Sequence, residues 1–307
     1  MKTSVIITVT MLLINSFSAP SQPGLNTKPS VADSLKEAGN IPAAIHAYKI
    51  LYSKNPQDYR NTYNYACALS INRQIDSSYK YLTLAVNQDA TISPLIDPDF
   101  LSLRRDQRWQ EFEDIVIEML NLKLNNAIKD KEYAKALWKM RAYDQALFTE
   151  VGIAGRNLGF KSSVVEALWL SKSIIQENSQ KELDELIELK GWPRVKDVGS
   201  EAAMAAYLTI MHSDAKLQKK YIPSIKKICE DNELPWFRYA NIYDRCCVNE
   251  NKPQRYGTHT IYNETSQTQE LYPLEDDSKV DLWRKEVGLQ PLAEYLAQFS
   301  ITYEPKK

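Results

Sequence analysis

The chain has 307 residues, of which 44% are hydrophobic and 25% charged, with a formal net charge of −1 at pH 7. This length favours two domains, each large enough to bury its own core. The near-zero charge argues against nucleic acid or an anionic membrane as a partner of the whole chain, and only 9 glycines and 14 prolines argue against a disordered chain.

The first residues have the pattern of a signal peptide. Lys2 provides a positive charge, Val5 to Ile14 form a short and mostly apolar core, and Ser16 to Ala19 offer small residues for cleavage. The apolar run is shorter than the roughly 20 residues that a spanning helix needs, so we expect no stable membrane span. Residues 1–19 are predicted to be a cleaved signal peptide and residues 20–30 a flexible linker. The mature protein is therefore expected to be periplasmic or secreted.

Residues 31 to about 88 contain two copies of one pattern, 34 residues apart. The first copy places its packing residues at Leu35, Gly39, Ile41, Ala44, Ile45, Tyr48 and Leu51, and the second at Leu69, Arg73, Ile75, Ser78, Tyr79, Leu82 and Ala85. The period and the small residue where two helices cross are typical of tetratricopeptide repeats, which bind proteins or peptides along a concave face. We therefore expect a protein or peptide partner here. Three residues either contribute to that face or pack between the helices: Tyr59, Tyr63 and Asn64.

The segment after the repeats is expected to close the stack, because repeat arrays of this kind need about three repeats. Asp97 can cap a helix that has Pro98 in its first turn. Apolar side chains then recur at helical spacing, at Trp109, Phe112, Ile115 and Met119. The repeats and this cap together form a predicted domain at residues 31–118.

A helical region follows, with apolar residues at helical spacing from Leu122 to about Leu189. Asp144-Gln145 interrupts its apolar stripe, which fits either an exposed helix face or a polar site. Gly191-Trp192-Pro193 ends the region, because Gly favours a helix C-terminus and Pro cannot continue a helix. The next segment, Glu201 to Met211, is nearly all apolar and predicts a buried helix.

His212 and Asp214 follow the predicted buried helix directly. An imidazole at a helix end can act as a base or a ligand, and Asp214 could orient it. Alternatively, the helix dipole favours His212 at that end, and Asp214 caps the next helix. On the sequence both interpretations stay open. The catalytic candidates are His212, Asp214 and Asp244.

Asp244-Arg245 also has two interpretations. A buried Asp/Arg pair can form an internal clamp with directional geometry. Alternatively, Arg245 recognises an anion.

Two segments rich in Thr, Tyr and Gln, Gln254 to Tyr262 and Gln267 to Tyr272, predict a β-hairpin. Strand alternation along its first arm places Gln254, Tyr256 and Thr258 on one face and His259 on the other. Gly257 permits a close backbone approach. The candidates for binding a small polar or anionic ligand are Arg245, Gln254, Tyr256, Thr258 and His259.

No phosphate loop, dinucleotide fingerprint, nucleophile elbow or zinc spacing occurs in the sequence, so no cofactor and no metal are predicted. A metal site with mixed carboxylate and imidazole ligands is chemically conceivable from His212, Asp214, His259 and Asp276. No spacing between these residues supports it. Cys67 is expected to be a buried free thiol. Cys229 could form a disulfide with Cys246 or Cys247.

Several of these motifs occur in an order that resembles DUF6624, a bacterial family of unknown function. The order is Gly191-Trp192-Pro193, Val198-Gly199, His212-Ser213-Asp214, Asp244-Arg245, Pro253-Gln254-x-Tyr256-Gly257-Thr258, Pro273-Leu274-Glu275-Asp276 and Val280-Asp281-x-x-Arg284. The resemblance covers about residues 120–300 and is closest at residues 191–295. It implies that Asp144-Gln145 is a family feature, and His259 stands where the family usually has Gln. No agreed activity comes with the family.

Together these patterns predict a mainly α protein. Helical-hairpin, tetratricopeptide-like repeats come first, followed by a mostly α domain at residues 120–307 with a small β-hairpin. The function they favour is an exported protein-binding module that carries a ligand-recognition domain. The alternative is a hydrolase with His212 as the base and a set of substrate-positioning residues, Asp244, Arg245, Gln254 and Tyr256. Convergence of His212, Asp244, Gln254 and Tyr256 on one pocket would favour the enzyme. Dispersal of these residues and pairing with the backbone would argue against it.

Overall fold

The structure, a computed structural model, describes residues 29–124, 128–263 and 267–304. The predicted signal peptide and most of the predicted linker lie outside these residues. The chain divides into two compact units, Gly24–His212 and Ser213–Lys307, which we call the N-terminal and C-terminal units. The border predicted near residue 119 falls inside the N-terminal unit and stays a prediction. Among the described helices, none combines the length and apolar character needed to cross a membrane.

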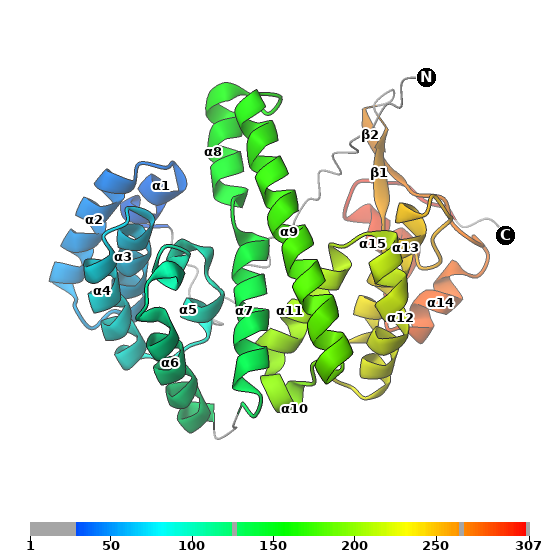
Figure 1. Cartoon of the computed structure of the whole chain (residues 1–307). Coiled ribbons are helices and arrows are strands. Elements are labelled where there is room, and N and C mark those ends of the chain that lie inside the picture. Colours follow the sequence, from blue (N-terminus) through cyan, green and yellow to red (C-terminus); the bar gives the residue numbers. More distant parts are fainter. Residues whose placement is uncertain (1–28, 125–127, 264–266, 305–307) are drawn as a thin grey trace. The chain divides into compact units, whose positions relative to one another are not determined.

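The N-terminal unit begins with four helices that pack in sequence order (Figure 1). They are α1 (Val31–Glu37), α2 (Ile41–Lys54), α3 (Tyr59–Ile71) and α4 (Ile75–Gln88). Helices α2 and α4 have 14 residues each and start 34 positions apart. The turns before them contain Gly39 and Arg73, also 34 apart, and both have a positive φ, 80° and 58°. The predicted 34-residue period is therefore present in the backbone geometry.

Small residues allow these helices to approach one another closely. Ala44 is fully buried, and the hydroxyl of Ser78, its counterpart in the second copy, donates to the carbonyl of Ala66 at 2.8 Å. Tyr59 and Tyr63 stack on each other, with ring centroids 5.6 Å apart. The Tyr63 hydroxyl donates to Asp97 at 2.8 Å. Of the two interpretations of these tyrosines, packing between helices is the one that the structure supports.

A closing segment and a second layer of helices complete the N-terminal unit. The elements of the closing segment are α5 (Ser93–Ile96), the short 3-10 helices η1 (Pro98–Phe100) and η2 (Leu103–Arg105), and α6 (Trp109–Leu124). As predicted, Asp97 caps a helix that starts with Pro98, because its side chain accepts the backbone N–H of Asp99 at 2.9 Å.

Helix α7 (Lys131–Gln145) is central in this unit, since it packs against α5, α9 and α11. The surrounding helices are α8 (Phe148–Leu158), α9 (Ser163–Lys190), α10 (Val195–Val198) and α11 (Ser200–Met211). Gly191 ends α9 with a φ of 80°, as expected for a helix stop. Helix α11 confirms the predicted buried helix, because Ala202, Ala205 and Ala206 are all at most 1% exposed.

The C-terminal unit contains a helical pair, a β-hairpin and two short helices (Figure 1). Its elements are α12 (Ala215–Glu230), α13 (Trp236–Asn249), β1 (Thr260–Asn263), β2 (Thr268–Leu271), α14 (Val280–Glu286) and α15 (Leu292–Ala297). The strands are antiparallel, with Thr260 opposite Leu271. Both arms of the predicted hairpin are therefore present, but shorter than expected. The fold is mainly α with one small hairpin among the described residues, as predicted.

Candidate functional site

A carboxylate and an imidazole from two packed helices meet in the N-terminal unit. Asp144 lies in the last turn of α7, and His212 caps the C-terminus of α11. Nδ1 of His212 lies 2.8 Å from Oδ1 of Asp144. The Asp144 side chain is 7% exposed, whereas the His212 side chain is 33% exposed. The pair therefore has a buried carboxylate and an imidazole that solvent can reach. The exposed helix face considered for Asp144 is not what the structure contains.

Other polar groups hold the Asp144 carboxylate in place. Gln145 donates to its Oδ2 at 2.8 Å, Arg141 lies 3.3 Å from the same oxygen, and Gln176 donates to Oδ1 at 3.4 Å. Burial by itself would raise the pKa of Asp144. The hydrogen bond and charge of His212, the charge of Lys172 and the Gln145 amide outweigh burial and hold this pKa well below its usual range. Asp144 is therefore an anion at neutral pH and can orient His212.

Lys172 on α9 fixes the chain where α7 ends. Its side chain is 2% exposed, and its ammonium donates to the backbone carbonyls of Asp144 and Ala146. The same ammonium lies 3.8 Å from the centre of the Phe148 ring. Leu147, which lies between α7 and α8, has a φ of 70°, an uncommon conformation for a residue other than glycine. Lys172 thus stabilises the sharp break between α7 and α8 that places Asp144 opposite His212. No motif in the sequence pointed to Lys172.

A cavity of about 10 Å³ adjoins the Asp144–His212 pair. This is about the room that one water molecule occupies. Besides the pair, polar side chains of Gln176, Gln180 and Thr209 line it. Gln180 also donates to the backbone carbonyl of His212 at 3.1 Å. An oriented imidazole beside a water-sized space is an arrangement suited to general acid–base chemistry.

A larger hollow, of about 610 Å³, lies near the N-terminus of α7. Four of its charged residues form two ion pairs with one another. Lys190 lies 2.6 Å from Asp130, and Lys129 lies 4.0 Å from Asp197. These pairs compensate the charges within the protein, and we assign them to local structure.

Asp244, on α13 in the C-terminal unit, holds the loop before β1. Its fully buried carboxylate accepts the backbone N–H groups of Arg255, Tyr256 and Thr258 at 2.8–3.1 Å, and the Thr258 hydroxyl at 2.9 Å. Burial raises the pKa of Asp244, and these hydrogen bonds oppose the rise. The internal Asp244–Arg245 clamp considered from the sequence is therefore not formed, and Asp244 holds backbone groups of the loop instead. No hydrogen bond or ion pair joins Asp244 to Arg245 among the described residues.

The side chains of Gln254 and Tyr256 also have partners within the protein. The Gln254 side chain is fully buried and forms a closed set of bonds. Its amide donates to the carbonyls of His259 and Tyr272, and its oxygen accepts the N–H of His259, all at 2.8–2.9 Å. Tyr256 packs edge-on against Tyr243, with centroids 5.9 Å apart. Neither side chain is directed to a ligand in this arrangement.

The loop from Gln254 to His259 does not alternate as a strand would. Gly257 has a φ of 66°, and the regular strand begins only at Thr260. As a result, Thr258 and His259 face each other locally, with Oγ1 and Nδ1 2.9 Å apart. The predicted separation of His259 from Thr258 onto opposite faces was therefore wrong, because a left-handed residue interrupts the extended backbone.

The remaining catalytic candidate, Asp214, has a local role. It is the N-cap of α12 and accepts the N–H of Leu217 at 2.8 Å. Asp276 accepts from Ser278 and pairs with Lys279 at 2.9 Å. The residues considered for a mixed carboxylate and imidazole site thus each have partners of their own.

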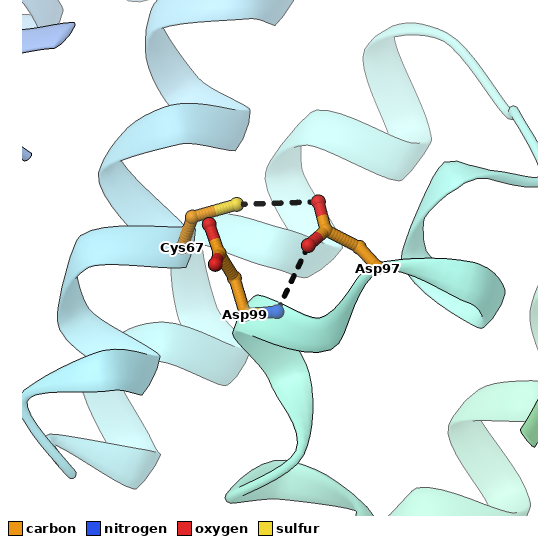
Figure 2. Close-up of side chains that lie close together, drawn as sticks. All are labelled: Cys67, Asp97 and Asp99. Atoms are coloured by element: carbon orange, nitrogen blue, oxygen red, sulfur yellow. Dashed lines mark hydrogen bonds between the residues drawn. The ribbon is translucent and has the colours of Figure 1, made fainter. Parts of the chain in front are cut away.

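A different cluster brings possible metal ligands together in the N-terminal unit (Figure 2). One ligand atom each from Cys67, Asp97 and Asp99 lies within 4.8 Å of the other two. Lys36 lies 2.8 Å from Asp99, however, and already supplies a positive charge. The cluster links α1, α3 and η1, and we assign it to the packing of these helices. The thiol of Cys67 is free, as expected, and the cysteines of the C-terminal unit are free as well, so the disulfide that we considered does not form.

The comparison with protein families matches the later part of the N-terminal unit and nearly all of the C-terminal unit. The chain matches a family described as "Family of unknown function (DUF6624)" over residues 132–306, more than half of its 307 residues. This range contains Asp144, Lys172, His212 and Asp244. No curated protein and no solved structure matches the chain. The chain therefore belongs to the DUF6624 family.

Proposed function

We propose that the family domain of this protein is a hydrolase-type enzyme in which His212 acts as the general base and Asp144 orients it. The observation that carries this proposal is the 2.8 Å contact between Nδ1 of His212 and Oδ1 of Asp144, with the carboxylate buried and the imidazole one-third exposed. A carboxylate at Nδ1 favours the tautomer with a proton on that nitrogen. Nε2 is then left with a lone pair that can accept a proton from water.

The surroundings support proton transfer from water. The cavity beside the pair has room for about one water molecule, and amide side chains of Gln176 and Gln180 line it. Such groups can hold a water molecule or a polar substrate by hydrogen bonds. Lys172 donates hydrogen bonds to the backbone carbonyls of Asp144 and Ala146 and so fixes the backbone at Asp144. We therefore infer a polar substrate whose hydrolysis begins with removal of a proton from water.

Pairing of Asp244 and Gln254 with the backbone argues against the hydrolase site as first considered, in which these residues and Tyr256 position the substrate. The present proposal therefore rests on the Asp144–His212 pair alone. The side chains of Asp244 and Gln254 form hydrogen bonds with backbone groups, and Tyr256 packs among aromatic rings. We assign these three residues to the stability of the C-terminal unit.

Turnover of chromogenic probes tests the proposal. The chain from residue 20 onward would be assayed with p-nitrophenyl acetate, p-nitrophenyl phosphate and bis(p-nitrophenyl) phosphate. We expect hydrolysis of at least one probe, reduced about 100-fold or more by His212→Asn, which is the typical size of a general-base contribution. Asp214→Asn serves as the matched control, because Asn is also a good N-cap. No hydrolysis by the wild type, or equal hydrolysis by His212→Asn, would contradict the proposal.

A second proposal concerns the repeats. We propose that residues 31–118 are tetratricopeptide-like repeats that dock a partner protein or peptide. The 34-residue spacing of α2 and α4, with a positive φ at both Gly39 and Arg73, favours this assignment. Chemical crosslinking of the full chain in its host, followed by mass spectrometry, tests it. Crosslinks to a partner should involve lysines of the repeats, such as Lys49 and Lys80, and crosslinks confined to residues after 118 would contradict it.

We also propose that the protein is exported through its first 19 residues. The support is the sequence alone, with a positive Lys2 and a short apolar core. Expression of the full chain in a bacterial host, followed by fractionation and mass measurement, tests this. We expect the wild-type protein to be found outside the cytoplasm without about its first 19 residues. We expect the Leu12→Arg variant to stay in the cytoplasm. An intact wild-type N-terminus in the cytoplasm would contradict export.

A further inference from the structure

Arg245 is a partly buried cation without a counterion among the described residues. It lies on α13, directly after Asp244. Its Nε is shielded from solvent and has no hydrogen-bond partner there. Two other arginines of this unit, Arg255 and Arg284, have polar partners within the protein. Arg255 pairs with Glu275 at 2.9 Å, and Arg284 donates to the carbonyls of Tyr256 and Gln290.

An arginine in this position is energetically unfavourable. Removing a cation from water costs several kcal/mol unless an anion or hydrogen bonds compensate it, and a guanidinium does not lose its proton in proteins. Burial lowers the pKa of Arg245, and no acidic group offsets this. Asp244, although adjacent in sequence, is committed to three backbone N–H groups and a hydroxyl. The charge of Arg245 could therefore be compensated by a bound anion.

The imidazole of His259 is held near α13 and feels the charge of Arg245. Asp244 holds Thr258, and the Thr258 hydroxyl lies 2.9 Å from Nδ1 of His259, so the loop fixes the ring near α13. Burial, followed by the positive charge of Arg245, lowers the pKa of His259 to about 4. The imidazole is thus neutral at pH 7 in an electropositive environment. A bound anion would reverse this effect, because a negative charge favours the imidazolium.

We propose that Arg245 and His259 form a binding site for an oxyanion, the carboxylate or phosphate group of a small ligand. A guanidinium offers paired N–H donors that match either group, and the imidazole offers another hydrogen-bonding group beside it. The site lies in the C-terminal unit and does not depend on the Asp144–His212 pair.

Thermal stability at pH 7 tests the site with defined probes. The wild-type chain would be heated with increasing sodium phosphate or sodium acetate, each matched in ionic strength with sodium chloride. We expect a rise in Tm with at least one oxyanion over chloride, because a ligand that binds only the folded state stabilises it. Phosphate and acetate as separate arms identify which group the site prefers.

The variants separate a binding role from a structural one. In Arg245→Gln, the apparent Kd for the oxyanion should rise at least tenfold, while Tm without the anion should be unchanged or higher, because an uncompensated cation is gone. Arg255→Gln is the matched control and should keep the response to the anion. A lower Tm in Arg245→Gln without anion, or an equal response of both variants, would overturn the proposal.

A second readout follows the His259 ring by NMR during an acid titration. In the wild type its pKa should rise when phosphate or acetate binds. In Arg245→Gln its pKa should be higher from the start and should not respond to the anion. A His259 pKa that is the same in both proteins would overturn the proposal, since the charge of Arg245 would then not reach the ring.

Discussion

The imidazole of His212 and the carboxylate of Asp144 lie 2.8 Å apart, although 68 residues separate them in the chain. The packing of α11 on α7 brings them together. Lys172 holds the carbonyls at the end of α7, and the side chains of Gln145 and Gln176 hold the carboxylate. One imidazole nitrogen is therefore fixed by a buried anion, while the ring remains partly open to solvent. This relationship is the basis of the proposed chemistry.

The stability contributed by Asp144 should depend on pH in a defined direction. Its pKa is lower in the folded protein than in the unfolded chain. A group of this kind stabilises the fold above its unfolded pKa, near 4, and loses that contribution as the pH falls. Asp144→Asn should therefore be less stable than the wild type at pH 7, and the difference should shrink toward pH 3. Urea unfolding at several pH values measures it, and a difference that grows on acidification would contradict the assignment.

Asp97 should show the opposite dependence. Burial, together with the charge of Asp99, raises the pKa of Asp97 to about 6. A carboxyl whose pKa is raised on folding stabilises the protein below its unfolded pKa, near 4, and loses that contribution as the pH rises toward 6. Asp97→Asn keeps a residue suited to a helix N-cap and removes the charge. Its free energy of unfolding should therefore fall less between pH 4 and 7 than that of the wild type. A steeper fall than in the wild type would be inconsistent with a raised pKa.

Asp244→Asn should destabilise the protein without a direct effect on hydrolysis. The amide that replaces one carboxylate oxygen would face N–H donors and leave at least one of them unpaired, which costs about 1–3 kcal/mol. Asp214→Asn is a suitable control, because its cap geometry tolerates Asn. Thermal unfolding of both variants measures the effect. Equal Tm values for the two would show that the loop before β1 does not depend on Asp244.

Gly257→Ala tests the close approach of the same loop to α15. An added Cβ would lie 2.7 Å from Cδ1 of Leu292, whose side chain is fully buried. Gly288 has a similar φ of 70° but no atom within 4 Å of an added Cβ. Both substitutions should cost about 1–2 kcal/mol for the left-handed backbone, and Gly257→Ala should cost about 1–3 kcal/mol more for the overlap. Equal losses would mean that Leu292 gives way.

Local patterns in the sequence predicted much of the fold. The 34-residue period gave the positions of α2 and α4, and the apolar run from Glu201 to Met211 became the buried helix α11. Gly191 ended α9 as expected. These features depend on residues close in sequence, whose spacing directly determines which face of a helix is buried.

The partners of the polar residues were harder to predict, because they depend on packing between distant segments. Asp144 was visible as a break in an apolar stripe, but nothing in its neighbourhood indicated His212 as its partner. For Asp244, the neighbouring Arg245 was the expected partner. Consecutive residues of a helix do not face each other, and α13 continues to Asn249, so the carboxylate turned to the loop instead.

The tautomer of His212 tests the central claim most directly, because it depends on Asp144 and requires no substrate. The two ring nitrogens of His212 would be observed by 15N NMR at neutral pH, in the wild type and in Asp144→Asn. We predict that the neutral ring of the wild type carries its proton on Nδ1 and leaves Nε2 free to accept one, and that Asp144→Asn loses this preference. A wild-type proton on Nε2, or the same tautomer in both proteins, would contradict the claim that Asp144 prepares His212 as a base.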